Sequence, residues 1–145
     1  MDETLQVSYF VLCDSVITEE NTRKQSLIGI YSGLSSQQFP FHINAAVALC
    51  IRVQSPNPRR LNIRLLGPDG SALFITPELP FNWSSVREGL RTFPFAVIQI
   101  AINLNMIPIS KPGSYLTELI CEDKVIATYP FSVIGQTPAP GHKVM

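Results

Sequence analysis

The sequence has little charge. Of its 145 residues only 15% are Asp, Glu, Lys or Arg, and eleven acidic and eleven basic side chains leave a formal net charge of zero. A typical domain carries about 25% charged residues. Because a neutral, weakly charged surface does little to keep copies of a protein apart, we expect a protein partner or self-association into a homo-oligomer.

Long apolar runs and export signals are also absent. No stretch approaches the roughly 20 apolar residues of a membrane-spanning helix, and the first ten residues carry acids where a secretion signal needs basic residues. The three cysteines, Cys13, Cys50 and Cys121, are odd in number and far apart, which is typical of reduced thiols. These absences predict a soluble, cytoplasmic protein without membrane contact.

The residue clusters that catalysis and cofactor binding require are missing too. No cysteine has a histidine or a second cysteine within a few residues, as a metal site would need, and no glycine-rich loop leads into a helix to hold a phosphate. Asp14, Ser15 and His42 could be assembled into a hydrolase-like trio. Nothing marks Ser15 as an activated nucleophile, and the alternative is that Asp14 or Ser15 caps a turn. We expect no catalytic residue, no metal and no cofactor.

Helical periodicity is lacking, and strand periodicity takes its place. The best helix candidate is Ser85 to Leu90, where Ser85 and Glu88 could form a capping box. From Ile43 to Val53 the odd positions are apolar and the even positions small or polar, and Ala96 to Leu104 alternates in the same way. Short strands separated by turns every 8–12 residues or so predict a β-sandwich, with a closed barrel as the alternative.

Turn residues place two hairpins. Gly67-Pro68-Asp69-Gly70 divides the apolar stretch 61–75, and Gly70 can take the left-handed conformation that closes the turn. Residues 122–124 turn the chain so that Cys121 lies opposite Val125, a register that sets Tyr115 beside Phe131 on a core face.

Two further pairings follow from the apolar pattern. Pairing Val53 with Leu61 keeps apolar residues opposite one another and predicts a hairpin between these neighbouring strands. Residues 5–12 are expected to pair with residues 26–31 around the charged tip at 19–24. The expected fold is thus an all-β antiparallel sandwich, loosely immunoglobulin-like, of about eight strands. It occupies residues 1–134 as a single domain, and residues 135–145 form a flexible tail.

Several short motifs occur in a recognisable order: Cys13-Asp14-Ser15-Val16-Ile17, Ser26-Leu27-Ile28-Gly29-Ile30-Tyr31, Phe39-Pro40-Phe41, Gly67-Pro68-Asp69-Gly70 and Lys111-Pro112-Gly113-Ser114-Tyr115. This order resembles a family of short bacterial proteins with no assigned function. The resemblance runs from about the first strand to Val133 and implies a single β-sandwich domain without catalytic residues. Residues 77–92 are longer here than in the family pattern.

That longer segment contains the first candidate binding site. Phe81 and Trp83 alternate with polar residues, and Trp83 is the only tryptophan of the chain, a few residues from Arg87 and Arg91. Aromatic and arginine side chains are enriched at binding hot spots, and long loops are often functional. The alternative is that Trp83 covers one end of the sandwich.

Small residues form the second candidate. Ala46, Ala48 and Ala101 share the outward positions of two strands, and a flat, uncharged face of this kind suits an interface between protein molecules. The alternative is that another part of the same chain covers them.

A basic segment is the third candidate. No acid lies between Glu20 and Asp69, and the four arginines placed around one predicted hairpin are Arg52, Arg59, Arg60 and Arg64. An anion could bind there. Nucleic acid is disfavoured because no exposed aromatic side chain is interleaved for base stacking. The alternative is a solvated, salt-bridged hairpin end.

The leading functional hypothesis is a non-catalytic protein-interaction or assembly module that binds an unknown protein or itself. A small-molecule or carbohydrate-binding domain that uses residues 77–92 is the alternative. A hydrolase is the third hypothesis.

Overall fold

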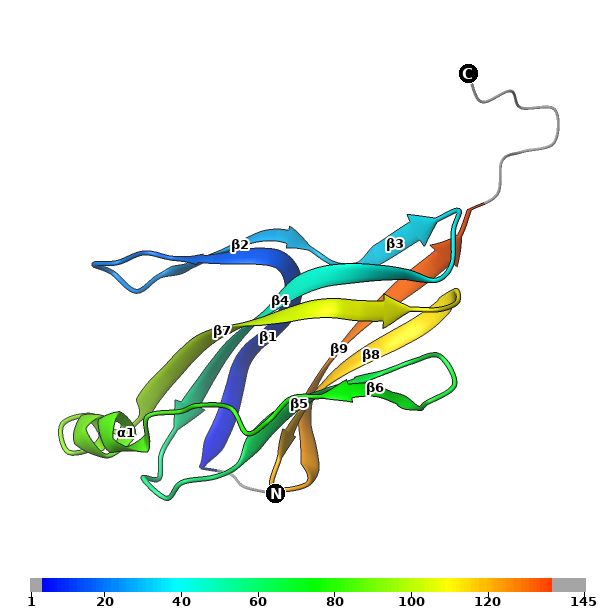
Figure 1. Cartoon of the computed structure of the whole chain (residues 1–145). Helices are drawn as coiled ribbons and strands as arrows, with labels where there is room; N and C mark the ends of the chain where they lie inside the picture. Colours follow the sequence, from blue (N-terminus) through cyan, green and yellow to red (C-terminus); the bar gives the residue numbers. More distant parts are fainter. Residues whose placement is uncertain (1–3, 137–145) are drawn as a thin grey trace, which may run out of the picture.

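Two β-sheets pack face to face in the computed structural model, which describes residues 4–136 (Figure 1). The first sheet has the strand order β2-β1-β4-β7, and the second has the order β3-β9-β8-β5-β6. The elements are β1 (Leu5–Thr18), β2 (Gln25–Ile30), β3 (Gly33–Ser36), β4 (Phe41–Val53), β5 (Leu61–Leu66), β6 (Ala72–Ile75), α1 (Trp83–Leu90), β7 (Ala96–Ile109), β8 (Gly113–Cys121) and β9 (Lys124–Gly135). The predicted sandwich is confirmed, with nine strands.

The core lies between the sheets and follows the predicted alternation. From Ala45 onward the odd-numbered residues of β4 are buried, and Val47, Leu49 and Ile51 are completely so. Leu61 and Ile63 of β5 meet them from the second sheet. Burial of these branched aliphatic side chains is the main source of stability in such a core.

Two details of the strand arrangement are immunoglobulin-like. The chain changes sheets between β2 and β3, and β3 then pairs with β9 in parallel, the one parallel pair among otherwise antiparallel strands. At the start of β8 the Tyr115 hydroxyl donates a hydrogen bond to the Lys111 carbonyl (2.7 Å). A tyrosine bonded back to the preceding corner is a hallmark of immunoglobulin-type sandwiches.

The predicted hairpin between residues 43–53 and the strand from Leu61 is wrong. β4 lies between β1 and β7, whereas β5 lies between β6 and β8 in the other sheet. Val53 and Leu61 are both fully buried, because each residue points into the core toward the opposite sheet. An alternating pattern fits two strands that stack across a core as well as two strands that pair side by side.

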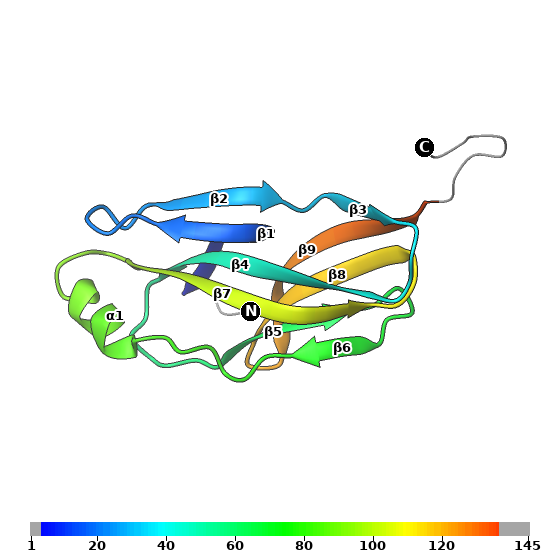
Figure 2. The same cartoon turned by 45° about the horizontal axis from the view of Figure 1, so that its top comes forward.

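The prediction for the N-terminal strands is partly wrong. Residues 5–13 of β1 pair with β4, and only residues 13–18 pair with β2. β1 bends sharply, and its second half leaves the sheet together with β2 as a hairpin arm, residues 13–30, whose tip is the predicted charged turn (Figures 1 and 2). Because of the bend, β1 pairs with β4 through its first half and with β2 through its second half.

The two hairpins placed from turn residues are confirmed. β5 and β6 pair around Gly67–Gly70, and Gly70 has a φ of 85°. In the β8–β9 hairpin Tyr115 lies opposite Phe131 with the rings stacked at 5.4 Å. Cys121 lies opposite Lys124 and not Val125, because the register shifts beside Ile120.

The short helix exists but starts two residues earlier than predicted. α1 begins at Trp83, and its N-cap is Asn82, whose Oδ1 accepts a hydrogen bond from the Ser85 backbone N–H (3.2 Å). The expected cap by Ser85 is therefore wrong. α1 covers the end of the sandwich near the start of β7, on the same side as the tip of the arm (Figures 1 and 2). β9 runs to Gly135, and most of the predicted tail lies outside the described residues.

Candidate functional site

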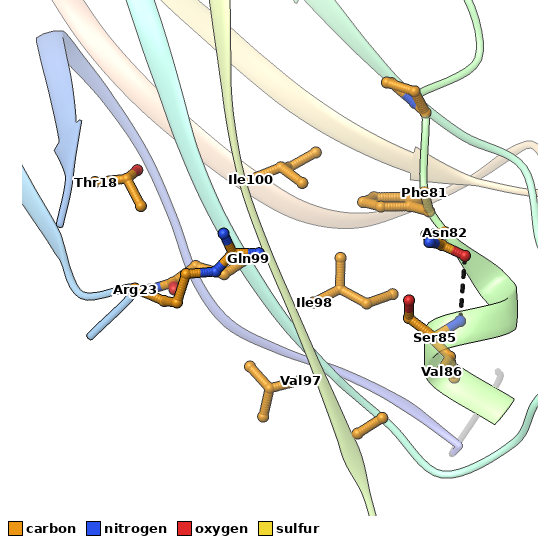
Figure 3. A pocket seen from close by; sticks show the side chains of 12 residues that line it. Thr18, Arg23, Phe81, Asn82, Ser85, Val86, Val97, Ile98, Gln99 and Ile100 are labelled. Atoms are coloured by element: carbon orange, nitrogen blue, oxygen red, sulfur yellow. Dashed lines mark hydrogen bonds between the residues drawn. The ribbon is translucent and has the colours of Figure 1, made fainter. Parts of the chain in front are cut away.

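A groove of about 700 Å³ follows the first residues of β7 (Figure 3). Its floor is residues 96–100 of β7, one wall is residues 80–82 with Ser85 and Val86 of α1, and the other wall is Thr18 and Arg23 of the arm. A smaller hollow of about 350 Å³ continues it past Ser85 to the exposed Phe93. The groove thus runs along a strand between two walls that come from distant parts of the chain.

β7 is an edge strand, and its free side faces this groove. Among the strands of residues 4–136 it pairs only with β4. Gln54, which follows β4, donates its backbone N–H to the carbonyl of Thr4, which precedes β1 (2.7 Å). Because backbone groups alternate in direction along a strand, the even-numbered residues of β4 face β1 and the odd-numbered residues face β7.

The register then identifies the unpaired backbone groups. Ala96, Ile98 and Ile100 lie opposite odd-numbered residues of β4 and bond to them. The residues between them direct their N–H and C=O groups away from the sheet, and these are Val97, Gln99, Ala101 and Asn103. No other part of residues 4–136 donates to or accepts from these outward backbone groups. The outward groups of Val97 and Gln99 therefore lie in the groove as free backbone donors and acceptors, and those of Ala101 and Asn103 continue the row beyond it.

The wall formed by the loop and α1 is held by aromatic packing. The Phe81 ring lies edge-on to Trp83, with ring centroids 6.0 Å apart. The Arg59 guanidinium lies 5.2 Å from the centre of the Trp83 ring, a distance at which cation–π attraction is significant. Phe81 is thus positioned in the wall by Trp83 behind it.

The arm is tied to the sheet by a short hydrogen-bond chain. The Tyr9 hydroxyl of β1 donates to Oε1 of Gln25 near the tip of the arm (2.5 Å), and Nε2 of Gln99 on β7 donates to the same hydroxyl (2.7 Å). One side chain therefore connects the arm, the sheet and the free edge. This connection fixes the distance between the arm and the floor of the groove.

Of the four binding residues predicted from residues 77–92, only Phe81 lines the groove. Trp83 is half-buried behind it and carries Arg59 on one ring face. Arg87 and Arg91 lie on exposed parts of α1 and its C-terminal cap and are absent from the groove lining; Arg91 pairs with Glu88 (3.5 Å). The segment does cover an end of the sandwich, as the alternative interpretation held.

The predicted pairing face of small residues is wrong for two of its three members. Ala46 and Ala48 are 1% and 0% exposed, and only Ala101 is accessible. The side chains of the neighbouring strands close over β4: Cys50 lies between Tyr9 and Gln99 in the register, and those two side chains bond above it.

The predicted shared face of the four arginines is also wrong. Arg52 belongs to the first sheet and Arg64 to the second, so no single hairpin carries both. Each guanidinium is engaged: Arg52, Arg59, Arg60 and Arg64 contact Phe95, Trp83, Glu122 and Glu118, respectively. The ion pairs are those expected of the salt-bridged alternative.

The metal-ligating side chains of the described residues are dispersed, and two of the thiols have raised pKa values. Among residues 4–136 no three His, Cys, Asp or Glu side chains gather to hold a metal ion. Burial raises the pKa of the Cys13 and Cys50 thiols, and the charge of Asp14 raises the pKa of Cys13 further. Raised thiol pKa values keep these cysteines protonated and poorly nucleophilic at neutral pH.

Sequence reasoning missed the edge of β7 and the arm residues that face it, Thr18 and Arg23. A signal was present, since all 14 residues of β7 lack Asp, Glu, Lys and Arg. Exposed edge strands usually carry charges that prevent pairing. The sequence alone does not say which strand lies at an edge.

Solved structures share this fold at low sequence identity. The chain is similar to the alkylpurine DNA glycosylase AlkC of Pseudomonas fluorescens, bound to DNA containing an abasic site analog, with 6% identity and a TM-score of 0.53; the match covers 91% of this chain and 31% of the glycosylase chain. It is also similar to an immunoglobulin-like protein of Pseudomonas aeruginosa, with 11% identity, a TM-score of 0.43, and coverage of 89% and 95%. The chain spans less than a third of the glycosylase chain, and the likeness concerns the fold alone.

No curated protein matches the sequence. Within residues 4–136 there is no helix of the length and apolarity needed to cross a bilayer. Residues 8–134 match the model of a family of unknown function, DUF6941. The match covers nearly all of the sandwich, and the chain belongs to this family.

Proposed function

We propose that this protein is a non-catalytic interaction module that binds a partner protein by adding an extended segment of that partner to the free edge of β7. The observation that carries the proposal is the row of outward backbone groups from Val97 to Asn103, which begins in a walled groove at Val97 and Gln99 and continues beyond it along β7. Strand addition at an exposed sheet edge is a recurring mode of peptide recognition, in which backbone hydrogen bonds supply affinity and pockets for alternate side chains supply specificity.

The other edges offer less to a partner. β3 and β6 have four residues each and β2 has six, and very short edge strands resist pairing. β2 is further interrupted by Gly29, whose φ of 69° departs from the extended conformation. β7 has 14 residues, and its run from Ala96 up to Met106, whose φ of 59° interrupts the strand, is the longest template.

The carbohydrate alternative has weaker support. A sugar would need an aromatic ring face to stack on, and one face of Trp83 is covered by Arg59. Phe81 alone of the predicted aromatic pair lines the groove.

A backbone-specific substitution tests the proposal. Ala101→Pro removes one outward N–H of β7, a position at which an edge strand tolerates proline, whereas Ala101→Val keeps that N–H. The side chain of Ala101 is not part of either wall, so the pair of variants isolates the backbone contribution. Random peptides selected on the wild-type protein are expected to bind Ala101→Val normally and to bind Ala101→Pro about tenfold more weakly, as the loss of one hydrogen bond predicts.

Hydrogen exchange supplies the second readout. The amides of Val97, Gln99 and Ala101 should gain protection when a selected peptide binds, and their neighbours that bond to β4 should change little. The proposal fails if selected peptides bind Ala101→Pro as tightly as the wild type, or if protection appears elsewhere. Thermal unfolding of both variants shows whether the sandwich is intact.

A further inference from the structure

We infer that the segment bound at β7 alternates apolar and acidic side chains. This inference rests on the proposed strand addition and specifies its ligand: an extended stretch with apolar residues at positions i and i+2 and an Asp or Glu between them. The two sides of the groove differ in chemistry, and successive side chains of an added strand point to opposite sides.

The inner side of the groove is apolar. Ile98 and Ile100 point toward the space between the sheets, where Phe81 and Val86 form the opposing wall (Figure 3). Side chains of an added strand that lie beside Ile98 and Ile100 would enter this space. Apolar side chains are favoured there, because each buried methylene contributes about 0.8 kcal/mol and a charged group would be desolvated without a partner.

The outer side of the groove is polar and carries a positive charge. Arg23 and Thr18 of the arm overhang the same end of β7 that Gln99 occupies (Figure 3). Of the charged residues at the tip, Arg23 is the one that lines the groove. Its backbone is fixed by the bond from its N–H to the Glu19 carbonyl (2.9 Å).

Arg23 is also available to a ligand. Its guanidinium forms no salt bridge or hydrogen bond within residues 4–136, whereas Glu19 at the same tip accepts a hydrogen bond from the Thr22 hydroxyl. A guanidinium in a groove wall prefers a carboxylate, which it can bind through two parallel hydrogen bonds. The outward side chain of the added strand next to Gln99 is therefore assigned as acidic.

Two synthetic peptides with blocked ends test the inference, one alternating Val and Glu and the other alternating Val and Lys. We expect the Val/Glu peptide to bind the wild type about fivefold more tightly, the effect of one partly exposed ion pair of about 1 kcal/mol. Arg23→Glu should reverse that preference. Lys24→Glu is the matched control: it makes the same change of charge at the next residue, which does not line the groove, and should preserve the preference.

The outcomes separate the two proposals. If Ala101→Pro weakens binding of the Val/Glu peptide but Arg23→Glu leaves the ratio of the two affinities unchanged, strand addition stands and the acidic assignment is wrong. If Arg23→Glu and Lys24→Glu shift the ratio equally, general charge and not the groove is responsible, and the assignment is again wrong. If neither peptide responds to Ala101→Pro, the strand-addition proposal itself fails.

Discussion

Gly113 shows how one residue can serve both the chain conformation and the packing. Its φ is 145°, and a Cβ at this position would lie 2.6 Å from the Cβ and the Cγ of Pro68. Gly70 has a φ of 85° but nothing within 4 Å of its would-be Cβ. Both glycines have a positive φ, which would strain any other residue. At Gly113 a side chain would also clash with Pro68.

Substitution separates the two reasons. Gly70→Ala should lower the free energy of unfolding by about 1 kcal/mol, the cost of a left-handed non-glycine residue. Gly113→Ala should cost clearly more, because Pro68 must also move. Urea denaturation measures both, and equal losses would show that the contact with Pro68 is relieved without cost.

Tyr31 makes the free energy of unfolding depend on pH. It is 8% exposed and packs edge-on against Phe131. Burial raises its pKa to about 12, and the nearby Asp14 carboxylate adds to the shift. Between pH 10 and 12 the unfolded chain loses this proton while the folded chain keeps it, so the free energy of unfolding falls as the pH rises.

The expected loss is up to about 3 kcal/mol, from 1.36 kcal/mol per pKa unit. Tyr31→Phe should start from lower stability but lose less of it between pH 10 and 12. Denaturant unfolding at several pH values provides the comparison. Parallel curves for the variant and the wild type would contradict a raised pKa at Tyr31.

At the scale of elements, turns and hairpin registers could be predicted from the sequence, whereas the pairing of distant strands could not. The Gly67–Gly70 turn and the β8–β9 register from Tyr115 to Leu119 follow from neighbouring residues and are confirmed. The pairing of β4 with β1 and β7 depends on strands far away in the sequence. Alternation in β4 says that one face is buried, but it does not identify the adjacent strands.

The arm is the element most dependent on one side chain. The Tyr9 hydroxyl bonds to Gln25 and Gln99 at once, so Tyr9→Phe removes both links while leaving the ring in place. At about 1 kcal/mol per hydrogen bond, the arm should open at least fivefold more often. Hydrogen exchange in β2 is expected to accelerate by that factor, with a smaller change in global stability.

Tyr115→Phe is the control for this prediction. It deletes the hydrogen bond to the Lys111 carbonyl at the start of β8, which should lower global stability without a selective effect on the arm. Unchanged exchange of β2 in Tyr9→Phe would show that backbone pairing with β1 alone holds the arm.

At the scale of the molecule, composition indicated a surface that favours association but not its location. The sequence predicted the sandwich, and of the four binding residues predicted from residues 77–92 Phe81 lines the groove. The groove itself needs the arm, the helix and β7 together, three segments brought together only by folding. Trp83 was predicted as a binding residue, but it does not line the groove. The sequence does not show its contact with Arg59, which lies 24 positions away.

The uncharged edge of β7 should also govern the solubility of the whole protein. Val97 is 56% exposed on this edge strand, while Ile134 is 60% exposed on β9, where it is paired with Ser35 of β3. Val97→Lys and Ile134→Lys change the net charge equally. Only Val97→Lys places a charge on a free edge, where charges oppose edge-to-edge pairing.

We therefore expect Val97→Lys to slow aggregation of the concentrated protein near its pI of about 6.7 several-fold more than Ile134→Lys does. Light scattering at matched concentration measures the rates, and thermal unfolding confirms that both variants stay folded. If both substitutions slow aggregation equally, net charge and not the β7 edge controls association, because the two variants differ only in where the lysine lies.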